Sequence, residues 1–239
     1  MNTLAVDTST NNLHLALRAN GQLEERLIIA ENKHSQILLK EVKSMLENQN
    51  IEAKDLELLA CTKGPGGFTS LRIGMSFLKG LATGLNIPLV SVLTSKLLYS
   101  VVEDFKYPTL TCIDAKKKRF YLALYEDGKT IIEDIDANIV NIKDILNQYD
   151  TILLTGPDAA LVKKDTEDLT CKVLVDTKTR ALGNELIDLA IKQYSEVGRD
   201  EIGDGPLYIR VSDAELSLQE RMNGKNWCYN YWSRPRRSL

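Results

Sequence analysis

Only 2 histidines, His14 and His34, are present in this chain of 239 residues. A metal site of the HxxxH or HExxH kind needs two imidazoles on one face of a helix, and neither motif occurs. No GxSxG sequence surrounds a serine, and no cysteine has a histidine near it in the sequence. The chain therefore lacks the usual motifs of metalloproteases and of serine or cysteine hydrolases.

Features of secreted, membrane-bound and nucleic-acid-binding proteins are also scarce. The 4 cysteines form no CxxC pair, and Cys61, Cys112 and Cys171 lie at or beside apolar segments, as buried reduced thiols do. No run approaches the roughly 18 apolar residues of a membrane span, and no basic segment precedes an apolar one at the N-terminus. The net charge of −3 gives no general attraction to nucleic acid. We expect a cytoplasmic protein without a signal peptide or a membrane segment.

The most informative segment is a glycine-rich stretch that reads GPGGFTS from Gly64 to Ser70. It follows an apolar strand and leads into an apolar helix, so its backbone could cradle a phosphate or seat the helix closely against a partner surface. A Walker A motif needs a lysine directly after its last glycine, but Phe68 follows Gly67 and the nearest cation is Arg72. The residues alone leave both roles of this loop open.

Hydrophobic periodicity predicts nearly the same order of elements twice. The first half has expected strands over 3–6, 13–18, 23–29, 56–61 and 88–92, with helices over 35–47, 70–83 and 95–102. The second half has expected strands over 110–113, 119–125, 130–135, 151–155 and 172–175, with helices over 142–148 and 182–194. Asp7, Leu15–Leu17 and Gly21 recur at identical spacing as Asp114, Leu122–Leu124 and Gly128. A duplication explains this repetition better than chance does.

The duplicated order predicts an α/β protein with two similar lobes, each a mixed sheet flanked by helices, and a cleft between them. We assign residues 1–104 to an N-terminal lobe and 105–216 to a C-terminal lobe, with the boundary near 103–108. Residues 217–239 form a C-terminal extension, in which an aromatic cluster around Trp227 precedes three arginines. That tail fits a flexible terminal extension, or a segment that stacks on and holds a nucleic acid.

The helix expected after the glycine loop carries more apolar residues than a surface helix needs. One stripe is made of Leu71, Met75, Leu78 and Ala82, and a second of Ile73, Phe77 and Leu81. Gly74, Gly80 and Gly84 each cost about 1 kcal/mol relative to alanine inside a helix, which favours a close helix approach over local stability. Either one stripe packs on the sheet and the other on another protein, or the helix is buried wholly within its own lobe.

Polar residues at the expected cleft are candidates for ligand contacts. Asp7 and Asp114 end strands and could hold a hydrated Mg²⁺ near nucleotide phosphates, although Asp7 also fits a plain Asx turn. Lys116 begins a basic run beside Asp114, which is either a solvated loop or an anchor for an anion or RNA phosphates. Possible ligand or cleft residues are Asp7, Gly66, Gly67, Thr69, Arg72, Asp114 and Lys116.

With these residues in view, the chain resembles the family of bacterial tRNA threonylcarbamoyladenosine biosynthesis proteins TsaB. The matching landmarks are Leu4–Thr10, Lys33–Gln36, Gly64–Gly74, Ile113–Lys116 and Pro206–Arg210. The resemblance covers about residues 1 to 216. The family's loop usually has a serine and a glycine where this chain has Gly67 and Ser70, and the usual arginine is replaced by Lys116, which keeps the charge but loses the bidentate fork.

The resemblance implies a fold of two ribonuclease H-like or actin-like lobes and a noncatalytic role. It implies partnership with the catalytic paralogue TsaD and the ATPase TsaE, in transferring a threonylcarbamoyl group to the adenosine beside the anticodon of tRNAs that read codons starting with A. It implies no metal or cofactor bound by this chain, with ATP and Mg in the partner subunits, and tRNA contacts made mainly through the complex.

For this family the partner surface is expected on the first two helices of the N-terminal lobe, and the same surface could support a homodimer. Carried onto this chain, the partner-interface residues are His34, Leu38, Val42, Met45, Leu71, Gly74, Met75 and Leu78. The alternative function is an independent ATP-dependent phosphotransferase of the sugar-kinase type, which would use Asp7 and the glycine loop.

Overall fold

The computed structural model describes residues 1–201 and 203–210. Met1–Ile209 form one compact unit of the chain. The predicted C-terminal extension, with its aromatic cluster and arginines, lies outside the described residues, and so does the last part of the range assigned to the C-terminal lobe. The residue bounds that we assigned to the two lobes stay predictions.

Five strands of the first half form a mixed sheet in the order β3-β2-β1-β4-β5. The strands are β1 (Thr3–Asp7), β2 (Asn12–Ala19), β3 (Gln22–Ile29), β4 (Leu58–Gly64) and β5 (Leu89–Leu93). β1 pairs antiparallel with β2 and parallel with β4, so β1 is the centre at which the two pairing modes meet. β1 is buried along its whole length, as its apolar sequence predicts.

The second sheet repeats this arrangement strand for strand, in the order β10-β9-β6-β7-β8. Its strands are β6 (Thr109–Asp114), β7 (Arg119–Glu126), β8 (Lys129–Asn138), β9 (Thr151–Thr155) and β10 (Lys172–Val175). β6 takes the place of β1, because it pairs antiparallel with β7 and parallel with β9. The predicted α/β fold of two similar lobes, each a mixed sheet flanked by helices, is confirmed.

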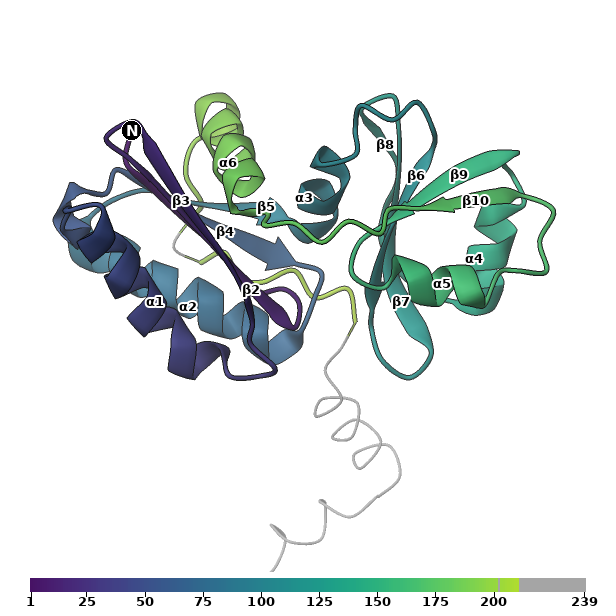
Figure 1. Cartoon of the computed structure of the whole chain (residues 1–239), viewed down its shortest axis with the longest axis horizontal. Helices are drawn as coiled ribbons and strands as arrows, with labels where there is room; N and C mark the ends of the chain where they lie inside the picture. Colours follow the sequence, from purple (N-terminus) through teal and green to yellow (C-terminus); the bar gives the residue numbers. More distant parts are fainter. Residues whose placement is uncertain (202, 211–239) are drawn as a thin grey trace, which may run out of the picture. The chain divides into compact units, whose positions relative to one another are not determined.

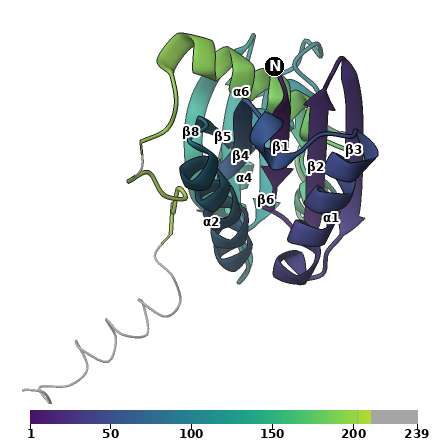
Figure 2. The ribbon, with the colours of Figure 1, turned by 90° about the vertical axis from the view of Figure 1, so that its left-hand side faces the viewer.

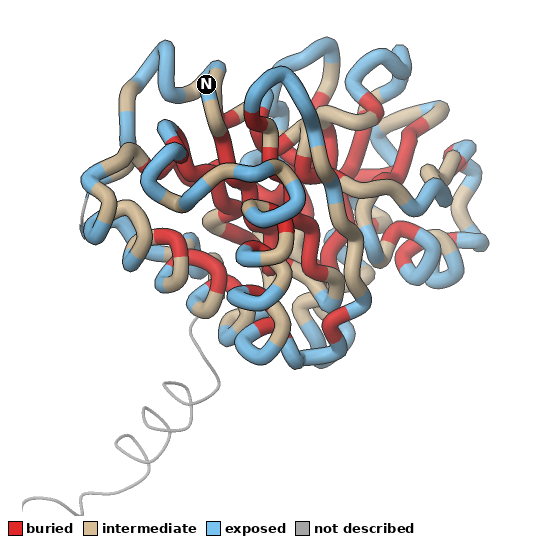
Figure 3. The backbone as a smooth tube through the Cα atoms, turned by 60° about the vertical axis from the view of Figure 1, so that its left-hand side comes forward, coloured by how far each residue is buried: buried red, intermediate tan, exposed pale blue. Residues whose placement is uncertain are grey.

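Helices α1 (His34–Asn48) and α2 (Phe68–Leu85) lie together on one face of the first sheet (Figures 1 and 2). Helices α4 (Ile139–Leu146) and α5 (Ala159–Lys164) pack on the second sheet, where they share one hydrophobic core with its strands. The sequence did not predict α5, which is short, or the short 3₁₀ helix η1 at Ala53–Asp55. Figure 3 shows the buried residues gathered in the strands and on the inner sides of the helices.

Helix α6 (Gly183–Val197) follows the second sheet in the chain but packs on the first sheet, against β1, β2 and β5 (Figure 1). Its first residue sits tightly on β2, because a Cβ on Gly183 would lie 2.5 Å from the Cβ of Ala16. Arg18 of β2 also pairs with Asp188 at 2.8 Å. The last helix of the repeat is therefore part of the first sheet's hydrophobic core, and it ties the two halves of the chain together.

Helix α3 (Thr94–Ser100) supplies the second contact between the halves. Leu97 and Leu98 pack with residues of the first sheet and α6, whereas Tyr99 packs with residues of the second sheet. The ring of Tyr99 stacks on Tyr125 with centroids 4.4 Å apart. Both lobes therefore bury apolar side chains against the same short helix.

The two apolar stripes of α2 belong largely to one core. Leu71, Met75 and Leu78 are buried, and Ile73, Phe77 and Leu81 are half-buried. Members of the second stripe, with residues of α1, pack against the same hydrophobic cluster as the first. The exposed positions of the helix are instead Thr69, Arg72, Ser76, Gly80, Thr83 and Gly84.

Two glycines of α2 lie in opposite environments and give a direct test of this packing. A Cβ on Gly74 would collide with Oγ1 of Thr8, a buried side chain held by its hydrogen bond to the Ser70 carbonyl at 2.7 Å. Gly80 has no atom within 4 Å of such a Cβ. We expect Gly74→Ala to lower the free energy of unfolding by about 1–3 kcal/mol through overpacking. Gly80→Ala should raise it by up to about 1 kcal/mol through helix propensity.

Urea denaturation followed by circular dichroism measures both values. If Gly74→Ala were as stable as Gly80→Ala, the close approach between α2 and Thr8 would be wrong.

Candidate functional site

The glycine loop is locked onto the turn that follows β1. The Gly67 N–H donates to the Ser9 carbonyl at 2.7 Å, and a Cβ on Gly66 would overlap that same carbonyl. Gly64 has a φ of +108°, and a Cβ there would lie 2.8 Å from the Leu207 carbonyl. The loop thus uses its glycines to approach other backbone segments of its own chain.

The eight predicted interface residues are buried within the chain itself. His34, Leu38, Val42 and Met45 lie on the inner side of α1, and Leu71, Gly74, Met75 and Leu78 on the inner side of α2. A partner that docks on these helices would therefore contact the exposed residues beside them. A substitution such as Met75→Glu, which places a charge in this core, tests folding rather than docking.

Asp7 holds the turn after β1 and faces a pocket. Its Oδ1 accepts hydrogen bonds from the Ser9 N–H at 2.8 Å and from the Thr62 hydroxyl at 2.7 Å, and the first of these is the bond of an Asx turn. The pocket has a volume of about 270 Å³. Besides Asp7 it is lined by residues of both halves, among them Asn12, His14, Gly156, Asp176 and Lys178.

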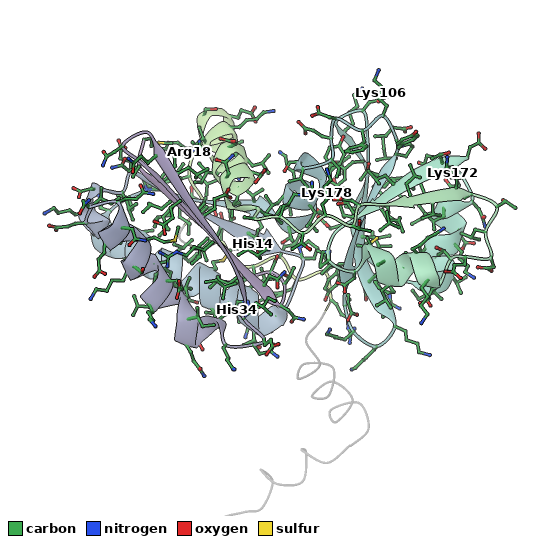
Figure 4. The ribbon with its side chains drawn as sticks, in the orientation of Figure 1. His14, Arg18, His34, Lys106, Lys172 and Lys178 are labelled. Atoms are coloured by element: carbon green, nitrogen blue, oxygen red, sulfur yellow. The ribbon has the colours of Figure 1, made fainter. Side chains whose placement is uncertain are left out.

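His14 lines this pocket as a neutral imidazole. Its Nδ1 accepts from the Leu182 N–H at 3.2 Å, so the ring proton resides on Nε2. Burial lowers the pKa of His14, although Asp7 and two glutamates oppose that effect. Figure 4 shows His14 and Lys178 coming from the two sides of this region.

The other predicted cleft carboxylate, Asp114, does not line the Asp7 pocket. It lies with the lysines 116–118 at a separate depression, together with Lys143 and Asp165. The Lys116 Nζ donates to Asp114 Oδ2 at 2.7 Å, and this hydrogen bond raises the pKa of Lys116. The structure therefore separates Asp7 from Asp114 instead of joining them in one metal or nucleotide site.

The segment Pro206–Arg210 lies beside the glycine loop and does not form a strand. The Leu207 N–H donates to the Lys63 carbonyl at 2.6 Å. The ring of Tyr208 stacks on Phe68 at 4.3 Å between centroids, and Tyr208 accepts a 2.7 Å hydrogen bond from Arg72 Nε. The guanidinium of Arg72 also lies over the Phe68 ring, so this predicted ligand residue is engaged within the chain.

A second, smaller pocket brings together residues that we had assigned to different roles. His34, predicted for the interface, lines it with Gly67 and Thr69, predicted for ligand contacts. The sequence analysis did not predict that these residues line one pocket, because no motif indicates that the start of α1 lies beside the start of α2. It also missed 155–157 and 176–180 at the Asp7 pocket, although the Gly156-Pro157 pair repeats the Gly64-Pro65 pair of the glycine loop.

Nucleophile and metal chemistry find little support in the described part of the chain. Cys61, Cys112 and Cys171 are buried thiols, and desolvation raises the pKa of each. No group of three or more histidine, cysteine or carboxylate side chains among the described residues could hold a metal ion. Within residues 1–201 and 203–210, no helix is long and apolar enough to cross a membrane.

These features define a two-lobed α/β protein with a docked glycine loop. The family model described as TsaD, tRNA N6-adenosine threonylcarbamoyltransferase, matches residues 28–185, and the chain belongs to this family. Within it, the chain is similar to the tRNA threonylcarbamoyladenosine biosynthesis protein TsaB of Bacillus subtilis (strain 168). The identity is 29% over 92% of this chain and 99% of that protein.

Other comparisons agree with this placement. TsaB of Escherichia coli (strain K12) is 30% identical over 53% of this chain and 55% of its own length. The solved structure of YeaZ from Pseudomonas aeruginosa superposes with a TM-score of 0.72, at 21% identity, over 87% of this chain and 99% of that one. The resemblance to TsaB is thereby confirmed, and the chain has a role in tRNA threonylcarbamoyladenosine biosynthesis.

One strongly shifted carboxyl group lies away from these pockets, at the contact of α3 with the second sheet. The Tyr125 hydroxyl donates to Ser95 Oγ at 3.1 Å, and Ser95 Oγ donates to Asp134 Oδ2 at 2.8 Å. Asp134 Oδ1 is buried without a hydrogen-bond partner. Burial raises the pKa of Asp134 to about 6. These hydrogen bonds therefore connect α3 to the second sheet through a carboxyl group that titrates at mildly acidic pH.

The shifted pKa of Asp134 makes stability depend on pH in a defined direction. The folded protein binds this proton up to pH about 6, whereas the unfolded chain loses it near pH 4, so the stability contribution falls as pH rises between these values. Asp134→Asn keeps an acceptor for Ser95 without the charge. We expect it to raise the free energy of unfolding by about 1–2 kcal/mol at pH 7.5 and by much less at pH 4.

Parallel urea titrations at the two pH values check this. An equal effect at both would show that ionisation of Asp134 is not the cause.

Proposed function

We propose that this chain is a noncatalytic scaffold and activator subunit of a complex that forms N6-threonylcarbamoyladenosine next to the anticodon of tRNAs reading codons that start with A. It acts with a TsaD-like catalytic paralogue and a TsaE-like ATPase, which bind ATP and Mg. The observation that carries the proposal is the similarity to TsaB over 99% of that protein's length.

The exposed side of α1 and α2 supports a docking role for this helix pair. Leu39 of α1 is 65% exposed, and Gly80 and Gly84 of α2 would have no atom within 4 Å of an added Cβ. Glycines inside a helix reduce its stability, and nothing in the described chain fills the space beside these two. A helix of another subunit could approach α2 closely there. A second copy of this chain is the competing occupant.

A tRNA contact through the complex agrees with the charge of the chain. The net charge of −3 provides no general attraction for phosphates, so the partners would supply most of the RNA binding. The lysines 116–118 are the local exception, and they are exposed at the depression beside Asp114.

The pocket beside Asp7 is the one observation that favours the alternative, an independent phosphotransferase. Its volume of about 270 Å³ lies just below the range of small-molecule sites, and Lys178 provides a cation at its rim. Calorimetry of the purified chain with Mg–ATP separates the two functions. Tight binding and turnover that Asp7→Asn abolishes would favour the phosphotransferase.

Reconstitution tests the scaffold role directly. The isolated chain should form no threonylcarbamoyladenosine on a substrate tRNA. Its addition to the TsaD-like and TsaE-like proteins should raise the initial rate of modification by at least about tenfold, a difference in barrier of about 1.4 kcal/mol. Quantification of the modified nucleoside by mass spectrometry provides the measurement. Full modification by the two partners without this chain would rule the proposal out.

Leu39→Glu tests the docking face without disturbing the core. The substitution places a charge on the exposed side of α1, so it should weaken association with the TsaD-like subunit by about tenfold or more, as expected for a central apolar contact. Val140→Glu is the matched control, because Val140 is 61% exposed on α4 of the other sheet. Sedimentation or calorimetry gives the affinities, and circular dichroism verifies the fold.

Equal affinities for the two variants would move the docking face away from α1. If Leu39→Glu instead disrupted only a homodimer, the helix pair would be the interface between two copies of this chain.

A further inference from the structure

His34 is a buried polar side chain that the fold leaves unsatisfied. It stands at the start of α1 (Figure 4) and is 1% exposed, yet neither Nδ1 nor Nε2 has a hydrogen-bond partner. A buried imidazole without partners loses its bonds to water and gains none in exchange. No role described above uses these two nitrogens, so a hydrogen-bond partner from outside the chain would satisfy them.

The ring lines a pocket of about 200 Å³ at which the starts of two helices meet. Asn32 lies just before α1 and His34 is its first residue, whereas Gly67 lies just before α2 and Phe68, Thr69, Ser70 and Ile73 belong to its first two turns. The first N–H groups of a helix have no partner inside the helix. No side chain in the described part of the chain caps α2, and Ser70 Oγ donates to the Gly67 carbonyl.

The electrostatics of this pocket favour an anion. Neither α1 nor α2 has an acidic residue in its first turn, so the positive ends of both helix dipoles are left uncompensated. None of the residues that line the pocket is a carboxylate. A negative group would therefore meet helix N–H groups, an imidazole N–H and the Thr69 hydroxyl, without a like charge among the lining side chains.

We propose that this pocket binds a phosphate-type oxyanion, held by the N–H groups at the start of α2 and by a ring N–H of His34. The N–H groups of Phe68, Thr69 and Ser70 bind up to three oxygens, and a ring N–H of His34 donates to a further oxygen. A tetrahedral oxyanion has enough oxygens for both sets of donors, whereas a carboxylate has two oxygens in one plane. The small volume suits the phosphate group itself, either free or as the end of a larger molecule.

The 2 histidines of the chain make this proposal directly measurable. In protein labelled with ¹⁵N-histidine, long-range ¹H–¹⁵N correlation spectra report each ring separately, and His34→Gln assigns the signals. Inorganic phosphate is titrated at fixed pH and ionic strength against potassium chloride. We expect a saturable shift of the His34 ring signals, with half-saturation below about 10 mM, while the His14 signals stay in place.

Acetate and ADP provide the two comparison arms. A shift with ADP at lower concentration than with phosphate identifies the group as part of a larger ligand, and a stronger shift with phosphate identifies the free ion. Either result supports the site. A response to acetate alone would overturn the proposal, because the pocket would then select a carboxylate, such as a side chain of a partner protein.

Thr69→Glu blocks the pocket without touching the buried imidazole. Thr69 is exposed, and a carboxylate in the first turn of α2 is compatible with the helix dipole, so the fold should persist. Phosphate affinity should fall by about tenfold or more, because the new charge occupies or repels the site. Thr83→Glu adds the same charge at an exposed position in the last turn of α2 and should change the affinity less than about twofold.

Two results would overturn the proposal in the folded, full chain. One is a His34 signal that does not respond to phosphate or ADP. The other is a response that Thr69→Glu and Thr83→Glu reduce equally, since it would then arise from general charge instead of the pocket. Neither result depends on the partner subunits, so the scaffold role is tested separately.

Discussion

The close approach between the glycine loop and the turn after β1 is the constraint on which the first lobe depends. Asp7 fixes the turn by accepting the Ser9 N–H, and the Ser9 carbonyl then accepts the Gly67 N–H. About two turns further along α2, Gly74 leaves room for the buried side chain of Thr8. This contact sets where α2 begins and which of its sides meets the sheet, so the core, the pocket at His34 and the exposed face all follow from it.

The duplicated order of elements gives two similar sheets, but the helices of the two halves differ in length and in packing. The second half has only the short α5 where the first has the 18 residues of α2, and α6 packs on the first sheet instead of its own. α3 also connects the two halves, because it buries side chains against both sheets. A chain joined in this way holds its two lobes through shared hydrophobic cores.

The structure also separates features that the sequence placed side by side. Asp7 lines one pocket, Asp114 another, and the glycine loop opens onto a third beside His34. No described cluster unites a nucleophile, a base and a metal ligand. What the first lobe offers instead is a helix pair with glycines on its exposed side and, at one end, a pocket that no carboxylate lines. Such a surface suits a subunit that acts through its contacts with other molecules.

The sequence by itself determined the order of strands and most helices along the chain, the duplication and the apolar stripes of α2, because alternation and helical periodicity are local properties of the chain. It determined the family as well, through landmarks such as Lys33–Gln36 and the glycine loop. Only the tertiary structure decided which stripe positions are buried, that α6 crosses to the first sheet, and that His34 meets Thr69. Those outcomes depend on contacts between residues far apart in the chain, and periodicity carries no information about which surfaces pack together.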